Sequence, residues 1–117
     1  MKGFGTYIRA QRERLSEDSK DFSLRKVAMK IGVEPAFLSK VERELVSPPS
    51  EGKIIALAKM LGEDQDVLLA MAGKVSSDLL KVIRDRPVMF GELIRRLKSE
   101  PDHAVLHIVR GVKDGEW

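Results

Sequence analysis

Basic side chains that could pair with phosphate groups are concentrated in the N-terminal third of the chain. Residues 1–14 carry four positive and one negative side chain, and residues 23–43 carry five positive and two negative. These two segments together carry a net charge of +6, so the other residues must carry −3 to give the total of +3. Such a distribution favours a surface that contacts nucleic-acid phosphates, although a solvated charged face would contain the same residues.

Two histidines near the C-terminus have a spacing that can support metal binding. His103 and His107 lie four residues apart and would share one face of a helix. Neither an HExxH pattern nor a third ligand accompanies them, so we interpret them as surface histidines and expect no metal site. The chain has no cysteine, which excludes disulfides, thiolate zinc sites and cysteine nucleophiles. The carboxylates are scattered and no glycine-rich phosphate loop occurs, so we expect neither a cofactor nor enzymatic activity.

The composition is that of an ordinary globular protein, with 43% hydrophobic and 33% charged residues. A length of 117 residues suits one compact domain, or a small domain with an appendage. No apolar run approaches the roughly 20 residues that cross a membrane. The charged N-terminus lacks the apolar centre of a signal peptide. We therefore expect a cytoplasmic protein that does not interact with membranes.

Apolar residues recur at helical spacing along most of the chain, which predicts an all-α fold. A first helix is expected over residues 5–15, followed by a polar loop. Ser23 is a good N-cap for a second helix that ends at Gly32, and Pro35 opens a third. After the break at VSPPS, a fourth helix is expected over residues 50–61 and a short fifth in DQDVLLAMA.

The second and third of these helices meet the steric requirements of a helix-turn-helix. Ala28 is small enough to lie where two helices cross, and Gly32 follows it at the turn. Leu38 comes six residues after this glycine. Further apolar residues at the same register would fill the angle between the helices: Val27, Ile31, Val33 and Val41.

The stretch SLRKVAMKIGVEPAFLSKVERELVSPPSEGKIIALAKMLG resembles the lambda-repressor/Cro-like family of helix-turn-helix regulators, also called the XRE family. The resemblance covers about residues 5–72 and is carried by VAMKIGV, FLSKVER, the proline-containing break and the helix that ends in Leu-Gly. It implies a five-helix DNA-binding domain over residues 1–73. It also implies that the helix beginning at Pro35 enters the major groove of double-stranded DNA, and that dimers bind pseudo-palindromic operators.

The resemblance implies which side chains of the third helix face the base edges. Lys40 could donate to guanine, and Ala36 could contact a thymine methyl group. Glu34 departs from the small hydroxyl residue typical of the family; its carboxylate could accept from a cytosine amine or act only as a weak N-cap. The five positions implied in base reading are Glu34, Pro35, Ala36, Ser39 and Lys40.

Other family positions concern the DNA backbone and the fit between helices. Phosphate contacts are implied for Arg9, Arg25 and Arg43, and Arg12 and Glu42 occupy positions where the family forms a structural ion pair. Two residues depart from the family pattern: Leu24 replaces a glutamine that touches phosphate, and Glu44 replaces the glycine after the third helix, which leaves the path of the chain after that helix open. Phe37 could pack in the core or along the DNA backbone.

Residues 74–117 are expected to form a helical pair and a short tail. The pair would present a set of apolar residues for which we predict a role in dimerisation, although these residues could instead fold back onto the first five helices: Leu79, Leu80, Ile83, Phe90, Leu93, Ile94 and Leu97. The tail after Pro101 is rich in β-branched residues and could be a strand or a helix. The whole pattern favours a homodimeric transcriptional repressor. The alternative is an antitoxin or adapter whose C-terminal region binds a partner protein.

Overall fold

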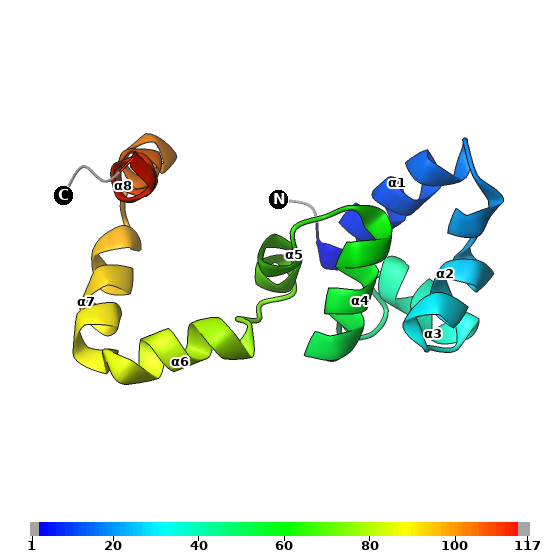
Figure 1. The fold of residues 1–117 in the computed structure, drawn as a ribbon, viewed down its shortest axis with the longest axis horizontal. Helices are drawn as coiled ribbons and strands as arrows, with labels where there is room; N and C mark the ends of the chain where they lie inside the picture. Colours follow the sequence, from blue (N-terminus) through cyan, green and yellow to red (C-terminus); the bar gives the residue numbers. More distant parts are fainter. Residues whose placement is uncertain (1–2, 115–117) are drawn as a thin grey trace. The chain divides into compact units, whose positions relative to one another are not determined.

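The computed structural model describes residues 3–114, and this range is all helical, as predicted (Figure 1). It contains eight α-helices, one 3₁₀ turn (η1) and no strand within the described range. The elements are α1 Phe4–Ser16, η1 Lys20–Phe22, α2 Leu24–Ile31, α3 Pro35–Glu42, α4 Glu51–Leu61, α5 Gln65–Met71, α6 Ser77–Asp85, α7 Pro87–Leu97 and α8 Asp102–Asp114.

The chain divides after Ser76 into two compact units. The first holds α1 to α5 and the second holds α6 to α8. The tail, for which the sequence left strand and helix open, is the helix α8, so the second unit has three helices and not a pair. The assignment of residues 1–73 to DNA binding and of 74–117 to dimerisation stays a prediction, because compactness does not test which task each part performs.

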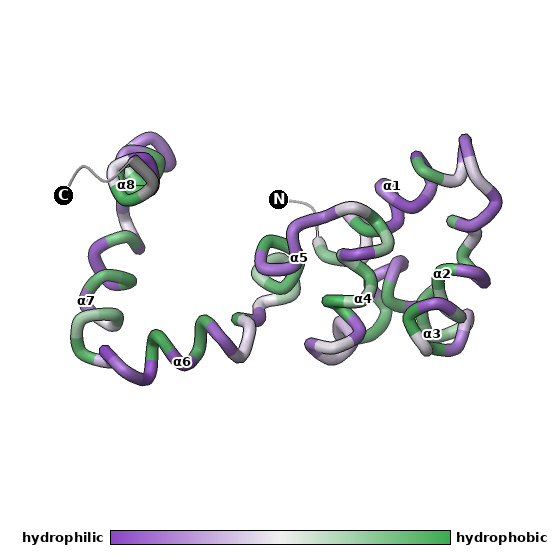
Figure 2. Tube along the Cα trace, in the orientation of Figure 1, coloured by the Kyte–Doolittle hydropathy of each residue, from purple (hydrophilic) through white to green (hydrophobic). Residues whose placement is uncertain are grey.

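One hydrophobic core holds the first unit together. It draws on all five helices, each of which has hydrophobic segments, coloured green in Figure 2. Side chains such as Ile8, Leu38 and Ile54 are at most 1% exposed. Its buried members are Phe4, Ile8, Val27, Ala28, Ile31, Leu38, Val41, Ile54, Leu57, Ala58, Leu61, Leu68 and Leu69. Since short helices are marginal alone in water, this shared burial is what keeps α2 and α3 helical.

Local capping sets the ends of α2. The Ser23 hydroxyl accepts a hydrogen bond from the Lys26 N–H at 3.2 Å, as expected of an N-cap. Gly32 has φ +81°, and the Val33 N–H donates to the Ala28 carbonyl at 2.9 Å. This left-handed turn satisfies the last carbonyls of α2 and reverses the chain within three residues, so that Pro35 can begin α3.

Glu44 settles how the chain leaves α3. It has φ +62°, the one positive φ at a non-glycine residue among residues 3–114. Its carboxylate Oε1 accepts from the Thr6 N–H at 2.8 Å and from the Thr6 hydroxyl at 3.3 Å. The side chain therefore caps the N-terminus of α1 from the far end of α3. The exit adopts the conformation that a glycine would favour, and the carboxylate offsets part of its steric cost.

A close backbone approach joins α1 to α3. A Cβ atom built on Gly5 would collide with the carbonyl oxygen of Val41. Only a glycine allows α1 to lie this near to the last turn of α3. Together with Glu44, this contact fixes the start of α1 against the end of α3.

The three helices of the second unit contain no buried residue over the range 77–112. Ion pairs one turn apart run along α6 and α7, between Lys81 and Asp85 and between Arg96 and Glu92, each at 3.1 Å. Within the described range, no helix has the length and apolar character required to span a lipid bilayer.

Candidate nucleic-acid interface

The helix α3 buries one face and offers the other to solvent. Leu38 and Val41 are 1% and 2% exposed, which holds the helix in the core. Glu34, Ala36 and Lys40 are exposed, whereas Pro35 and Ser39 are half-buried. All five predicted base-reading residues therefore keep accessible surface, and their contacts with bases stay predictions.

Two of these positions lack internal partners that would hold them back from DNA. Glu34 is the N-cap of α3 but its carboxylate makes no capping hydrogen bond. Lys40 takes part in none of the ion pairs formed among residues 3–114. Both side chains could reorient toward a ligand without breaking an intramolecular bond.

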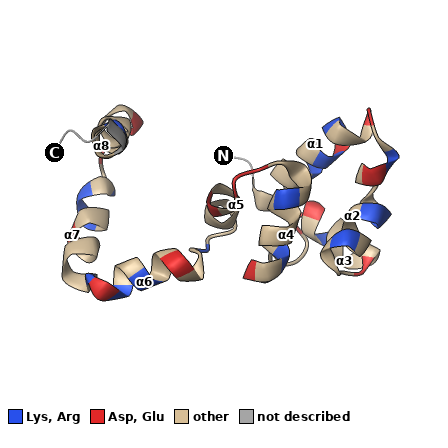
Figure 3. Cartoon of the chain, viewed as in Figure 1, with Lys and Arg blue, Asp and Glu red and all other residues tan. Residues whose placement is uncertain are grey.

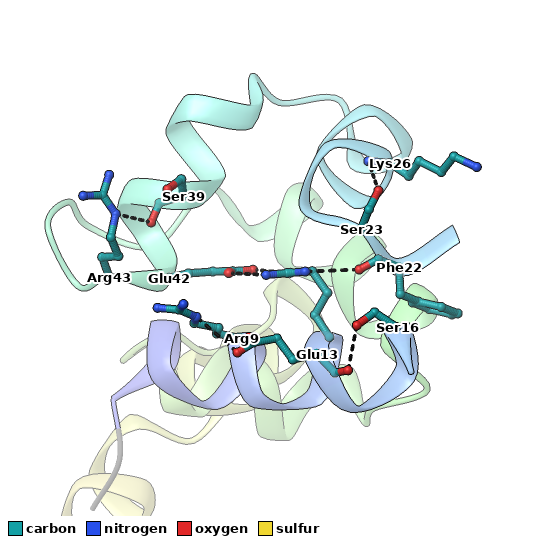
Figure 4. Close-up of polar contacts among 10 residues, drawn as sticks. Arg9, Glu13, Ser16, Phe22, Ser23, Lys26, Ser39, Glu42 and Arg43 are labelled. Atoms are coloured by element: carbon teal, nitrogen blue, oxygen red, sulfur yellow. Dashed lines mark hydrogen bonds and ion pairs between the residues drawn. The ribbon is translucent and has the colours of Figure 1, made fainter. Parts of the chain in front are cut away.

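Arg12 and Glu42 form the predicted ion pair in a bidentate geometry (Figure 4). The distances are 2.7 Å from Arg12 Nε to Glu42 Oε2 and 2.8 Å from Nη2 to Oε1. Arg12 Nη1 also donates to the Phe22 carbonyl at 3.2 Å. With 11% and 5% of their side chains exposed, the two residues are nearly enclosed. The hydrogen bonds to Glu42 raise the pKa of Arg12, so this guanidinium stays charged and connects α1, η1 and α3.

The three predicted phosphate-contacting arginines lie on two different parts of the surface. Arg9 and Arg43 line a small cavity of about 130 Å³ where α1, α2 and α3 converge, together with Arg12, Leu24, Ser39 and Glu42. Arg9 is paired with Glu13 at 3.2 Å, and Arg43 Nε donates to the Ser39 carbonyl at 3.3 Å. Leu24, which stands where the family has a glutamine, contributes an apolar wall here and no donor.

Arg25 belongs to a second cationic hollow that sequence reasoning had not identified. It lies beside Lys20 and Lys26 around the start of α2, with the hydroxyl-bearing residues Ser16, Ser19 and Ser23. Lys26 Nζ lies 3.5 Å from Asp21 Oδ1. Both side chains are exposed, so solvent screens the attraction between them. The signal that could have revealed this hollow is the succession of serine caps before η1 and α2, since caps mark where backbone N–H groups point outward. Figure 3 shows the basic residues on α1, α2 and α3.

Phe37 packs against the core while remaining half-buried. Of the two roles left open by the sequence, the structure supports packing between helices. The pair His103 and His107 is exposed on α8, and no group of three or more metal-ligating side chains occurs among the residues that the structure describes.

Comparison with known proteins gives one match. A helix-turn-helix family model matches residues 8–68, from the middle of α1 to α5, which is more than half of the chain. No curated protein and no solved structure matches the chain.

Proposed function

The chain belongs to the lambda-repressor/Cro-like family of helix-turn-helix transcriptional regulators, and from this premise we propose that it is a repressor that binds a pseudo-palindromic operator as a homodimer. Membership accounts for DNA binding. The repressor role, the two-fold operator and the homodimer are the further steps of the proposal, and repression would follow from occlusion of a promoter.

The observation that carries the proposal is the accessible polar face of α3 on a helix anchored from behind. Leu38, Val41 and the Arg12–Glu42 pair hold the inner side. This leaves the outer side for a groove wide enough to admit one α-helix. We assign base contacts to Lys40, Ala36 and their neighbours on this face: Glu34, Pro35 and Ser39.

Phosphate contacts would position the helix and carry no sequence information themselves. We assign them to Arg9 and Arg43, which line the small cavity between α1, α2 and α3, and to Arg25 with Lys20, which line the hollow at the start of α2. The Arg9–Glu13 pair is exposed by 51% and 56%, so exchanging the carboxylate for a phosphate costs little.

A homodimer would let two copies of α3 enter successive major grooves, about 34–36 Å apart. Once one copy is bound, the second binding step becomes effectively intramolecular, which raises the overall affinity without any new contact. Modest base contacts per copy therefore suffice for tight operator binding.

The test is to select binding sites from a random DNA pool and to compare variants on the selected duplex by electrophoretic mobility shift at fixed salt. Lys40→Ala should weaken specific binding by about 1–3 kcal/mol and relax the preference at one base pair of each half-site. Lys59→Ala is the matched control, because it removes the same charge from an exposed position on α4. A selection that yields no enriched motif, or equal losses for both variants, would contradict base reading by α3.

A further inference from the structure

The first unit has an apolar hollow beside α2 that the DNA-binding proposal does not use. Its volume is about 680 Å³, and it is lined by residues of η1, α2 and the end of α4 but by none of α3. Phe22 and Met60 are half-buried and pack against the hydrophobic core, whereas Met29 is 66% exposed. The full lining is Asp21, Phe22, Lys26, Met29, Lys30 and Met60.

Two lysines one helical turn apart form a cationic edge of this apolar hollow. Lys26 and Lys30 are both exposed on α2. Lys30 belongs to none of the ion pairs found over residues 3–114. Lys26 Nζ lies 3.5 Å from Oδ1 of Asp21, the acidic residue of the lining. The lining therefore has a net charge of +1, and Lys20 and Arg25 add positive charge in the adjoining cationic hollow at the start of α2.

Lys26 lines both the apolar hollow and the cationic hollow. Figure 4 shows the side chains of Lys26 and Phe22 pointing to the same side of the domain, away from Ser39 and Arg43 on α3. A ligand in the apolar hollow would therefore leave these two α3 residues uncovered. It would nevertheless compete for Lys26 with a DNA phosphate bound in the cationic hollow.

We propose that the apolar hollow docks an acidic amphipathic helix of a partner protein, and that the docked helix weakens DNA binding by occupying Lys26. The competition rests on the proposed DNA-binding function, whereas the docking does not. An apolar side chain of the helix packs on Phe22, Met29 and Met60, and its carboxylates pair with Lys26 and Lys30. Methionine suits such a surface because its flexible, unbranched side chain adapts to the shape of a partner.

The shape and the chemistry of the apolar hollow favour this occupant over others. Four of the six lining residues are exposed, so a small molecule would remain largely in water, whereas small-molecule sites bury most of their ligand. A DNA backbone would pair with the lysines but has no apolar side chain to cover the methionines. A basic segment would be repelled by the net positive charge. An acidic helix with one apolar face satisfies both parts of the lining.

The docking is tested on the DNA-free full chain by nuclear magnetic resonance of isotope-labelled methionine methyl groups. The probe is a synthetic amphipathic helix with leucine and phenylalanine on one face and glutamate on the other. It should shift the signals of Met29 and Met60. Met89 lines another apolar hollow, in the second unit, and its signal should stay unchanged. The same peptide with lysine in place of glutamate should bind at least about tenfold more weakly.

Two pairs of variants separate the apolar and the charged parts of the proposed site. Met29→Ala should weaken peptide binding about fivefold by removing apolar contact area, whereas Met89→Ala should not, although Met89 is similarly exposed, at 70%. Lys30→Glu should weaken it about tenfold, because a repulsion replaces an attraction. Lys59→Glu makes the same charge change at an exposed position of α4 outside the hollow and should have little effect.

The competition is tested by mobility shift on the selected duplex at fixed salt. Saturating peptide should weaken DNA binding by about fivefold or more, and the duplex should weaken peptide binding by the same factor, because coupling between two binding sites is reciprocal. Lys26→Met should bring this factor close to one. Lys20→Met is the matched control, since Lys20 lines only the cationic hollow: it should weaken DNA binding and preserve the coupling.

Four results would overturn the proposal. Unchanged Met29 and Met60 signals, or an equal shift of Met89, would show that the hollow does not specifically dock an acidic helix. Signals that move with protein concentration alone would place a second copy there. Signals that respond to the duplex and not to the peptide would assign the hollow to the DNA interface. A DNA affinity unaffected by bound peptide would disprove the competition. A chain that docks the peptide but binds no duplex would instead contradict the proposed function and support the docking.

Discussion

Glu44 illustrates how one side chain can reconcile two conflicting local requirements. The backbone at this residue is left-handed, which disfavours any residue with a Cβ. The carboxylate compensates by accepting two hydrogen bonds from Thr6, at the start of α1. The cap and the backbone strain involve the same residue, so two different substitutions at Glu44 should distinguish their contributions to stability.

Replacing Glu44 by alanine and by glycine should therefore give different results. Glu44→Ala keeps the left-handed strain and removes the cap, so the free energy of unfolding should fall by about 1 kcal/mol. Glu44→Gly removes both the cap and the left-handed strain. The loss of the cap lowers the free energy of unfolding and the relief of strain raises it, each by about 1 kcal/mol, so the net change should be close to zero. Urea denaturation of the two variants measures this ordering. An alanine variant as stable as the wild type would show that the cap contributes nothing.

Arg12 and Glu42 give a second prediction at the residue scale. Removing one partner leaves a nearly enclosed charge unpaired, so Arg12→Leu should lower the free energy of unfolding by about 3 kcal/mol. Arg9→Leu breaks another arginine–glutamate pair, Arg9–Glu13, which is exposed. This variant should change the free energy of unfolding by less than about 1 kcal/mol. Equal losses in urea denaturation would mean that enclosure of the pair has no energetic consequence.

At the scale of elements, the crossing of α1 and α3 depends on the absence of a single methyl group. Gly5→Ala would force its Cβ against the Val41 carbonyl, so α1 has to shift. We expect a loss of about 2–3 kcal/mol in the free energy of unfolding, typical of overpacking.

Gly52→Ala is the matched control for Gly5→Ala. Gly52 is also the second residue of its helix, α4, and a Cβ there would meet nothing within 4 Å. Alanine should therefore leave stability unchanged or raise it by up to about 1 kcal/mol through helix propensity. Thermal unfolding of both variants provides the comparison; a tolerated Gly5→Ala would show that the helices can separate at no cost.

The elements that the sequence predicted well are those bounded by local chemistry. Ser23, Gly32 and Pro35 set the ends of α2 and α3 through interactions within a few residues, so their types were sufficient. The helix α8 could not be assigned because its β-branched residues fit both strand and helix. The link between Glu44 and Thr6 spans 38 residues, and no local pattern reports such a contact.

The candidate site divides in the same way. Exposure of Lys40 and burial of Leu38 follow from helical periodicity, and the Arg12–Glu42 pair followed from family resemblance. The hollow formed by Lys20, Arg25 and Lys26 was missed because it depends on how η1 places Lys20 against the start of α2. That placement is a tertiary property.

At the scale of the whole molecule, the two units differ in how they obtain stability. The first has a core of its own, whereas the described part of the second has no buried side chain. In the proposed homodimer, the concentration of operator-competent dimer varies with the square of the monomer concentration at low levels, so occupancy of the operator responds steeply to synthesis and dilution.

The missing internal bonds at Glu34 and Lys40 have an evolutionary consequence. Because neither side chain supports the fold through a cap or an ion pair, both can mutate with little thermodynamic penalty. The orientation of α3 is fixed by other residues, which join it to α1 and are not among the predicted base-reading positions: Gly5, Arg12, Glu42 and Glu44. Descendants of this gene could therefore acquire new target sites by drift at a handful of positions, while the orientation of the helix is inherited unchanged.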